Sequence, residues 1–590
     1  MTDAPTLLGV LDALLREDAA GLRSRTTRIE LPDGSWLRLP APGDALLLPV
    51  RTTAPAFQYG TQVRLPLLRR ESDGTELTGP AAVLGALAAV ADPRDRPGFA
   101  ALEAECRQAD ATVRLHRATD EAVRHDLGER YGPDPAHWTG PAAALAFDTL
   151  AARIDHPVHP TGRGRAGFTE TELRAYAPEF HPRFPLRWLA VPHEAVTATG
   201  RFDDICPPPS ALGLPHHLDT THRTLPVHPL TAGAPLRRAL DATGLTGRAH
   251  LADLPHHDVV PTLSTRTVSL VHDPAVHLKM PLATATLGAL NRRTIKPGTL
   301  VDGAAAQRLI TAVADREPRF RHTVLHADET GWAHAGHELL AVLVRRPPPG
   351  LDPGTTTAVP LAALLAPAPG GGLVVDRLAD RFHGGDPLAL LDAVLTLLFD
   401  WQTTLLGYGI ALESHQQNIT LLYDTTAPHG TGGPRLLLKD NDGPRIHPGR
   451  LRAALGDAAE ATGVFETSRF DDRRIVTDDD RALLDLFTTI TVHLCAGAYA
   501  FGLARRGHPP LDRLLGLIRD RLAEAAERLG TGPGEMGALL RARVLDAARL
   551  PVKAMVTAGT LLAKERSGAL DINKHYTTGP NYLLRGSDPR

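Results

Sequence analysis

Cysteine is nearly absent from this sequence of 590 residues. Its three cysteines, Cys106, Cys206 and Cys495, lie far apart and form no CxxC pair. This spacing argues against a zinc ribbon and against a disulfide framework. The 27 histidines include no HExxH or similar ligand spacing, so a structural zinc site is not expected. A reducing cytoplasm fits this composition.

An excess of charge of either sign is also missing. The 64 lysines and arginines nearly balance the 67 aspartates and glutamates, and a net charge of −3 predicts neither a nucleic-acid nor a membrane partner. The N-terminal segment MTDAPTLLGVLDALLRED carries acids and no basic start, unlike a secretory signal. The most apolar helical stretch, Leu388–Leu406, contains Asp392, Asp400 and Gln402, which favours a buried helix over a membrane span.

Two proline-rich segments without periodicity divide the chain, which is too long for a single core. They are FDDICPPPSALGLPHH at 202–217 and APAPGGG at 366–372. We therefore predict an N-terminal domain at 1–205, a second at 206–372 and a third at 373–590. Helical patterns dominate the first and third, and strand patterns the second, so the expected class is α+β.

The stretch 409–443 combines a dense polar cluster with two short apolar runs around a Gly/Pro-rich turn, which predicts a β-hairpin. The ends of antiparallel strands lie side by side, so Asn418 at its entrance and Asp440 at its exit can converge. Hard oxygen ligands of this kind suit Mg²⁺ shared with phosphate. Protein kinases place a catalytic-loop Asn and a metal-binding Asp in the same way, and Glu413 has the spacing of the kinase base. A plain surface hairpin remains the alternative.

Three further stretches carry positive charge, although no Walker A motif occurs anywhere. Alternation in AVHLKMPL places Lys279 on the face opposite Leu278, where it either holds phosphate, as in kinases, or faces solvent. The segment 284–303 is rich in Thr, Gly and basic residues and can hold an anion. The loop His156–Arg165 contains two histidines and two arginines, and is either an anion site or a solvated turn.

Five blocks in order resemble the IucA/IucC family of NRPS-independent siderophore (NIS) synthetases, from about His156 to the C-terminus. They are HPVHPTGRGRAGF with YAPEF, PVHPL, STRTV with HLKMPL, TLGALNRR, and ALESHQQN with KDNDG. The sequence departs from the family pattern at Arg163 and Lys439, at Leu230-Thr231, and at the final GPNYL. These departures put substrate identity in doubt more than activity.

The resemblance implies a cupped hand of three parts, with a thumb, a fingers domain built on an antiparallel sheet and a mostly helical, kinase-like palm. It implies ATP-dependent adenylation of a carboxylate of citrate or a related polycarboxylic acid, followed by condensation with an amine or a hydroxyl. The cofactors would be ATP and Mg²⁺, the partners small molecules only, and a homodimer is left open.

The resemblance also implies roles for individual residues. Ser264, Arg266 and Lys279 would bind the triphosphate, and Asn418 and Asp440 would hold Mg²⁺. Glu413 and Gln417 match nucleotide-pocket positions, although Glu413 could instead orient His415. His156, Arg163 and Thr286 match substrate-binding positions. His415, Arg292 and Arg293 match catalytic positions, with the choice between the two arginines left open.

Two other functions compete with a synthetase at this point. A small-molecule kinase could use the same hairpin and would release ADP instead of AMP. A non-catalytic ATP-binding module would release neither product, although the joint presence of Lys279, Arg266, His415, Asn418 and Asp440 argues against it.

Overall fold

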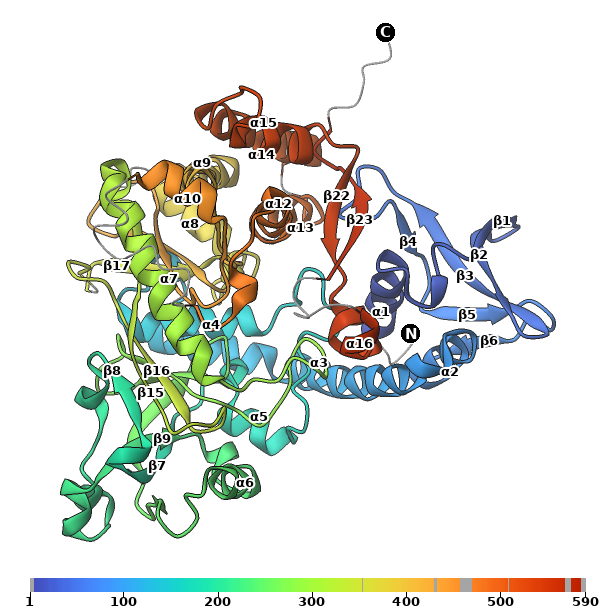
Figure 1. Ribbon diagram of the computed structural model, residues 1–590. Helices are drawn as coiled ribbons and strands as arrows, with labels where there is room; N and C mark the ends of the chain where they lie inside the picture. Colours follow the sequence, from blue (N-terminus) through green and yellow to red (C-terminus); the bar gives the residue numbers. More distant parts are fainter. Residues whose placement is uncertain are drawn as a thin grey trace.

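The computed structural model describes residues 5–352, 354–428, 432–456, 470–507, 509–567 and 575–584. Within them the protein is a mixed α+β structure whose strands pair antiparallel, with a parallel pair between β14 and β20 (Figure 1). Three sheets carry the architecture, with six, nine and four strands.

The N-terminal part combines a six-stranded sheet with helices that pack on it. The long helix α3 runs along the base of this part (Figure 1) and leads into α4, whose buried face joins the core of the C-terminal part. The elements of the N-terminal part are α1 (Pro5–Arg16), β1 (Thr27–Leu31), β2 (Gly34–Ala41), β3 (Asp44–Thr52), β4 (Thr61–Val63), β5 (Leu67–Arg70), β6 (Glu76–Thr78), α2 (Pro80–Val90), α3 (Arg96–Tyr131), α4 (Gly140–Ala152) and α5 (Glu170–Tyr176).

The nine-stranded sheet has the order β10-β7-β11-β12-β13-β16-β15-β8, with β9 also paired to β7. Apolar residues from alternate strand positions and from α6 (Ala234–Thr243) form its separate core. Its strands are β7 (Phe184–Pro192), β8 (Thr197–Thr199), β9 (His222–Val227), β10 (His250–Leu251), β11 (His256–Pro261), β12 (Thr267–Leu270), β13 (His277–Lys279), β15 (Asp328–His334) and β16 (Ala341–Arg346).

The four-stranded sheet, in the order β14-β20-β19-β17, lies among the helices of the C-terminal part. The predicted hairpin is present, because β19 and β20 pair antiparallel with Ile419 opposite Leu438. The elements are α7 (Pro297–Arg316), β14 (Val324–His326), β17 (Thr356–Pro360), α8 (Val374–Phe382), α9 (Pro387–Gly407), β18 (Ile410–Ala411), β19 (Ile419–Asp424), β20 (Arg435–Leu438), β21 (Arg445–Ile446), α10 (Pro448–Leu455), α12 (Asp480–Phe487), α13 (Ala498–Ala504), α14 (Leu511–Arg528) and α15 (Met536–Leu540).

The boundaries predicted from the proline-rich segments do not coincide with these sheets. Strands β7 and β8 precede residue 205 but belong to the nine-stranded sheet, and β17 precedes residue 372 but belongs to the four-stranded sheet. The prolines of 202–217 lie in or between short 3-10 turns that connect β8 and β9, inside the second part. Proline content therefore marks an irregular connection within this part and not the end of a sheet.

The last described segments return to the N-terminal part. Strands β22 (Arg549–Lys553) and β23 (Tyr576–Pro580) form a hairpin between the C-terminal helices and the first sheet, and α16 (Lys564–Ser567) lies near α1 and α3 (Figure 1). The Glu17 carboxylate accepts hydrogen bonds from the backbone N–H groups of Val556 (3.3 Å) and Thr557 (2.7 Å). These contacts join the two ends of the described chain.

Two described helices are long and apolar enough to cross a membrane, Pro387–Gly407 and the continuous helix Asp480–Ala504. In the first, 61% of the apolar window is buried inside the protein, and in the second all of it. Both therefore contribute to the core of the C-terminal part.

Candidate functional site

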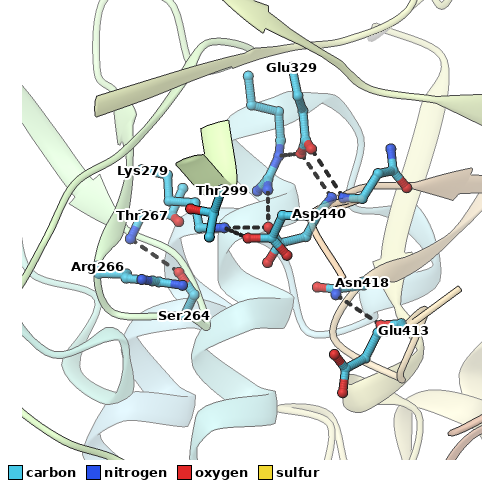
Figure 2. Close-up of polar contacts among 12 residues, drawn as sticks. Ser264, Arg266, Thr267, Lys279, Thr299, Glu329, Glu413, Asn418 and Asp440 are labelled. Carbon is cyan, nitrogen blue, oxygen red and sulfur yellow. Dashed lines mark hydrogen bonds and ion pairs between the residues drawn. The ribbon is translucent and has the colours of Figure 1, made fainter. Parts of the chain in front are cut away.

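The two ends of the β19–β20 hairpin meet, as the sequence predicts. The Lys439 N–H donates to the backbone oxygen of Asn418 (3.1 Å), so the residues entering and leaving the hairpin are neighbours. Asp440 follows with φ of 66°, in the left-handed region that a non-glycine residue adopts at some cost in strain. This conformation turns its carboxylate away from the strand and toward the nine-stranded sheet (Figure 2).

A buried glutamate holds that turn. Glu329, on β15, accepts hydrogen bonds from the backbone N–H groups of Asp440 (2.9 Å) and Asn441 (3.4 Å), and it forms an ion pair with Arg345 on β16. A backbone N–H pair bound by one carboxylate fixes the loop, and the arginine compensates the buried charge. Glu329 could not be predicted from the sequence, because nothing local links it to a turn 111 residues away.

Lys279 lies between two carboxylates, and its side chain is buried with 4% of the residue exposed. Its Nζ forms an ion pair with Asp440 and approaches Oδ2 of Asp442 to 3.2 Å (Figure 2). This rejects the solvent-facing alternative. Burial would raise the pKa of Asp440, but the charges of Lys279, Arg345 and Arg266 hold that pKa below its usual range. Burial raises the pKa of Asp442, and the Asp440 carboxylate adds to this shift.

The turn between β11 and β12 supplies the next polar groups. Ser264 Oγ accepts from the Thr267 N–H (3.1 Å), and Arg266 donates to the backbone oxygen of Thr294 (2.7 Å). Burial lowers the pKa of Arg266, which points into the same space as Lys279. Arg165 supports this turn through a 3.0 Å hydrogen bond to Thr265.

Of Arg292 and Arg293, the structure places only Arg293 in the cleft. Arg293 bonds through its backbone to Leu282 and Thr284 and turns its side chain into the cleft, whereas 75% of the Arg292 side chain is exposed. Burial, with the nearby Arg266 charge, lowers the pKa of Arg293 to about 9. Its Nε has no hydrogen-bond partner among the described residues, which leaves a buried donor for a bound anion.

His415 is a neutral imidazole near this cluster. The Gln417 N–H donates to Nδ1 (3.3 Å), which favours the tautomer with its proton on Nε2; this Nε2 lies 3.5 Å from Nδ2 of Asn418, and as Nε2–H it can donate to a carboxylate or carbonyl oxygen. Burial lowers the pKa of His415 to about 4. Beside it, the Glu413 carboxylate accepts a 2.9 Å hydrogen bond from Lys553 of β22, which the sequence analysis also missed.

The loop His156–Arg165 contributes to the site and is not a solvated turn. His156 is half-buried, with Nδ1 accepting from the N–H groups of Val158 (3.3 Å) and His159 (3.0 Å), and desolvation lowers its pKa to about 3. Arg163 forms a 2.8 Å ion pair with Asp155. Both side chains line the cleft, as does Thr286.

These groups surround one cleft of about 280 Å³ between the nine-stranded sheet and the β19–β20 hairpin. A second cavity of about 470 Å³ shares Arg266, Lys279 and Asp442 with it and contains Arg292. The predicted site residues that line the first cleft are His156, Arg163, Ser264, Arg266, Lys279, Thr286, Arg293, Glu413, His415, Gln417, Asn418 and Asp440.

The donor set fits a magnesium ion better than a transition metal. Carboxylates of Asp440 and Asp442 and the Asn418 amide offer hard oxygen ligands, and Mg²⁺ needs only one or two carboxylates when phosphates and water complete its shell. The described ranges contain no group of three or more His, Cys, Asp or Glu that could enclose a metal ion by itself.

Two family models match the chain. The IucA/IucC family matches residues 144–366, and the "Ferric iron reductase FhuF-like transporter" family matches residues 389–568. The second segment contains one cysteine, the buried Cys495.

Curated relatives cover part of the chain. Staphyloferrin A synthase of Staphylococcus aureus is 25% identical over 338 residues, covering 53% of this chain and 55% of the relative. The rhizobactin siderophore biosynthesis protein RhbC of Rhizobium meliloti is 28% identical over 439 residues, covering 67% of this chain and 70% of the relative. The chain thus spans about half the length of the first of these relatives.

Solved structures extend the likeness to the whole fold. The petrobactin biosynthesis protein AsbB of Bacillus anthracis superposes with a TM-score of 0.73 at 16% identity, covering 99% of this chain and 95% of that one. ATP-bound aerobactin synthetase IucA of Klebsiella pneumoniae gives 0.65 at 20% identity, covering 99% and 100%. Residues 144–366 therefore match the IucA/IucC family, and the fold of the whole chain is similar to that of AsbB and IucA.

Proposed function

We propose that the protein is an ATP-dependent, AMP-forming ligase of siderophore biosynthesis. It would adenylate a carboxylate of citrate or a related polycarboxylic acid and then join the acyl group to an amine or a hydroxyl. The observation that carries this proposal is the position of one neutral imidazole, His415, in the same cleft as three cations, the buried Lys279 and the half-buried Arg266 and Arg293. A polyanionic nucleotide and an acid both need this concentration of positive charge.

In the first step, an oxygen of the substrate carboxylate attacks the α-phosphate, and pyrophosphate leaves. Lys279 and Arg266 neutralise the triphosphate, and Ser264 supplies a further polar contact. Arg293 and the Nε2–H of His415 hold the carboxylate and place it for attack. Asn418 and Asp440 would hold Mg²⁺, which supplies charge neutralisation at the phosphates when bound.

In the second step, the amine or hydroxyl attacks the acyl carbon, and AMP leaves with the bonding electrons of the acyl–oxygen bond. The carbonyl oxygen gains negative charge in this step, and the Nε2–H of His415 can donate to it. No covalent bond to the enzyme is required, so the residues act by positioning and by electrostatics.

The division of labour in the fold follows from the same proposal. The nine-stranded sheet would act as the fingers, the four-stranded sheet with its helices as the palm, and the N-terminal part as the thumb of a cupped hand. This assignment is supported by the position of the cleft, whose lining includes residues of the fingers, of the palm and of the loop His156–Arg165.

Incubation with ATP, Mg²⁺, citrate and hydroxylamine tests the function. We expect pyrophosphate, AMP and citryl hydroxamate, and His415→Ala should reduce their formation by about 10²–10³-fold, the usual cost of removing one donor to a developing charge. A kinase is the second candidate function, because the Lys279–Asp440 pair lies beside Asn418. A kinase would release ADP and a phosphorylated acceptor. Absence of pyrophosphate with every di- and tricarboxylic acid offered would refute the ligase proposal.

A further inference from the structure

The nucleotide cleft contains a carboxylate that the proposed adenylation step does not use. Glu413 lines the cleft, and its carboxylate is directed away from Asp440, with Asn418 between the two (Figure 2). The Asn418 amide donates to the backbone oxygen of Glu413 (3.4 Å), so this contact leaves the Glu413 carboxylate apart from the residues expected to hold Mg²⁺. The acid therefore lies at the end of the cleft that is opposite to the phosphate-binding groups.

The backbone places Glu413 next to the catalytic imidazole. The His415 N–H donates to the carbonyl oxygen of Glu413 (2.9 Å), which closes a tight turn over two residues. Desolvation lowers the pKa of His415, and the negative charge of Glu413 opposes this shift, as expected for a carboxylate close to the ring. A nucleophile that attacks the acyl carbon beside His415 therefore also approaches Glu413.

Lys553 shows which kind of group this carboxylate binds. Its Nζ donates to Oε1 of Glu413 at 2.9 Å, and 7% of the lysine is exposed. The lysine head is a primary alkyl-ammonium, the same functional group as a protonated amine substrate. A carboxylate can accept about four hydrogen bonds, so an acceptor ammonium can bind Glu413 beside Lys553. The charge of Lys553 also favours the ionised form of the carboxylate, which is the form that can accept a proton.

Apolar side chains line the cleft near this acid. The buried π-helix Thr488–Gly497 packs on the chain directly after Glu413. Two of its side chains, Ile490 and Leu494, line the cleft, and so does Met555, which follows strand β22. Apolar walls with one convergent carboxylate suit an alkyl amine, because the hydrocarbon contacts the walls while the ammonium contacts the acid.

The chemistry of the second step requires a proton acceptor at this position. A primary alkyl amine has a pKa of about 10.4, so only about 0.1% of it is neutral at pH 7.4, and the ammonium has no lone pair with which to attack. Glu413 precedes Asn418 by five residues. Protein kinases place the carboxylate that takes the proton of the attacking hydroxyl at the same spacing before their catalytic-loop asparagine.

We propose that Glu413 is the general base of the condensation step and takes a proton from the acceptor ammonium. The nitrogen lone pair that this transfer frees forms the C–N bond to the acyl carbon, and AMP leaves with the bonding electrons of the acyl–oxygen bond. A second proton of the same nitrogen passes to the phosphate of AMP, which completes the amide. This inference rests on the proposed ligase function and assigns the proton transfer of its second step.

Acceptors that differ in charge test this assignment. Hydroxylamine is neutral at pH 7.4, whereas four probe amines are ammonium ions: ethylamine, ethanolamine, 1,4-diaminobutane and 1,5-diaminopentane. The ratio of kcat for hydroxamate to kcat for the fastest amide, each at saturating acceptor, should rise by about 100-fold or more in Glu413→Gln, within the usual contribution of a general base. Any loss in adenylation affects both products and cancels in this ratio. A raised KM for the amine with an unchanged ratio of kcat values would show binding without proton transfer and would overturn the assignment.

Two further variants serve as controls. Glu413→Gln removes the carboxylate that pairs with the buried Lys553, so Glu413→Gln/Lys553→Gln provides the same comparison without an uncompensated ammonium, and its ratio should also be raised by about 100-fold. Glu527→Gln removes one carboxylate of an exposed pair with Arg541, outside the cleft lining, and should keep the parent ratio.

The outcomes separate this assignment from the function on which it rests. A ratio within about threefold of the parent value in both Glu413 variants would overturn the assignment, as would a parent enzyme that forms the hydroxamate but joins none of the four amines. A parent enzyme that forms no hydroxamate with any di- or tricarboxylic acid would refute the ligase function itself, and the assignment with it.

Discussion

Lys279→Met removes the cation that lies between Asp440 and Asp442, and two effects should follow. The first is on stability. Breaking a buried ion pair by removing one partner costs about 3–5 kcal/mol, because a charge remains buried without compensation. The lower end of this range is expected here, because Arg345 Nη2 lies 3.8 Å from Asp440 and the charge of Arg266 also acts on it.

The second effect is on catalysis. Lys279 is the strand cation nearest to the predicted metal ligand, so its loss should lower kcat/KM for pyrophosphate release by about 10²–10³-fold. Added Mg²⁺ should partly restore the unfolding midpoint of the variant, because it supplies a cation to the two carboxylates that have lost Lys279. Mg²⁺ should raise the midpoint of the parent less, since Lys279 already occupies the position between the carboxylates.

Pyrophosphate release at saturating and limiting ATP, together with urea unfolding with and without Mg²⁺, measures both effects. Arg183→Met is the matched control, because it breaks an exposed pair with Asp258 next to the same sheet, and such pairs are worth about 0–1 kcal/mol. If Lys279→Met changed kcat/KM by less than threefold and unfolded at the same urea concentration as Arg183→Met, the reasoning about this site would be wrong.

The remaining predictions concern the cleft and the core. Arg293→Met should lower kcat/KM for pyrophosphate release at least tenfold, whereas Arg292→Met, on the exposed side, should change it by less than threefold; equal effects would contradict the assignment of Arg293 to the cleft. Burial lowers the pKa of His326 to about 4, so the unfolded chain binds a proton there first and stability falls as the pH drops from 6.5 toward 4. The free energy of unfolding of His326→Leu, measured in urea, should therefore rise by about 2 kcal/mol relative to that of the parent when the pH is lowered from 7.5 to 5. A variant with the same pH dependence as the parent would count against this prediction. Gly288→Ala should destabilise the protein by about 1–3 kcal/mol, because φ is +114° and a Cβ would lie within 2.9 Å of the Gly559 backbone; an unshifted unfolding midpoint would contradict this close contact.

Local signals in the sequence predicted the parts of the site that lie within one short element. The hairpin followed from two apolar runs around a turn, and the orientation of Lys279 followed from alternation within a strand. Glu329 and Lys553 could not be found in this way, because their site contacts join residues 111 and 140 positions apart. A buried ion pair leaves no pattern in the flanking sequence of either partner.

Sheet membership was predicted less well, for a related reason. Proline-rich segments indicate where the backbone cannot join a regular element. However, β7 and β17 each pair with a strand that lies beyond such a segment in the sequence, β11 and β19 respectively. Pairing depends on the whole sheet, and a single strand sequence does not specify its partner. The resemblance to a family compensated for this at the level of function, since its blocks contain the residues that the fold brings together.

The docking of the C-terminal hairpin has a consequence for biosynthesis of the protein. Lys553 reaches Glu413 only after β22 has been made, and the Gly559 oxygen accepts from the Leu290 N–H, which holds the loop that contains Arg293. At about 5–20 residues per second, synthesis of the 121 residues from Asp440 to Leu561 takes roughly ten seconds. For that interval the nascent chain already contains Lys279 and Asp440, but not the segment that brings Lys553 and Met555 to the cleft. A nascent chain of that length therefore lacks one wall of the cleft.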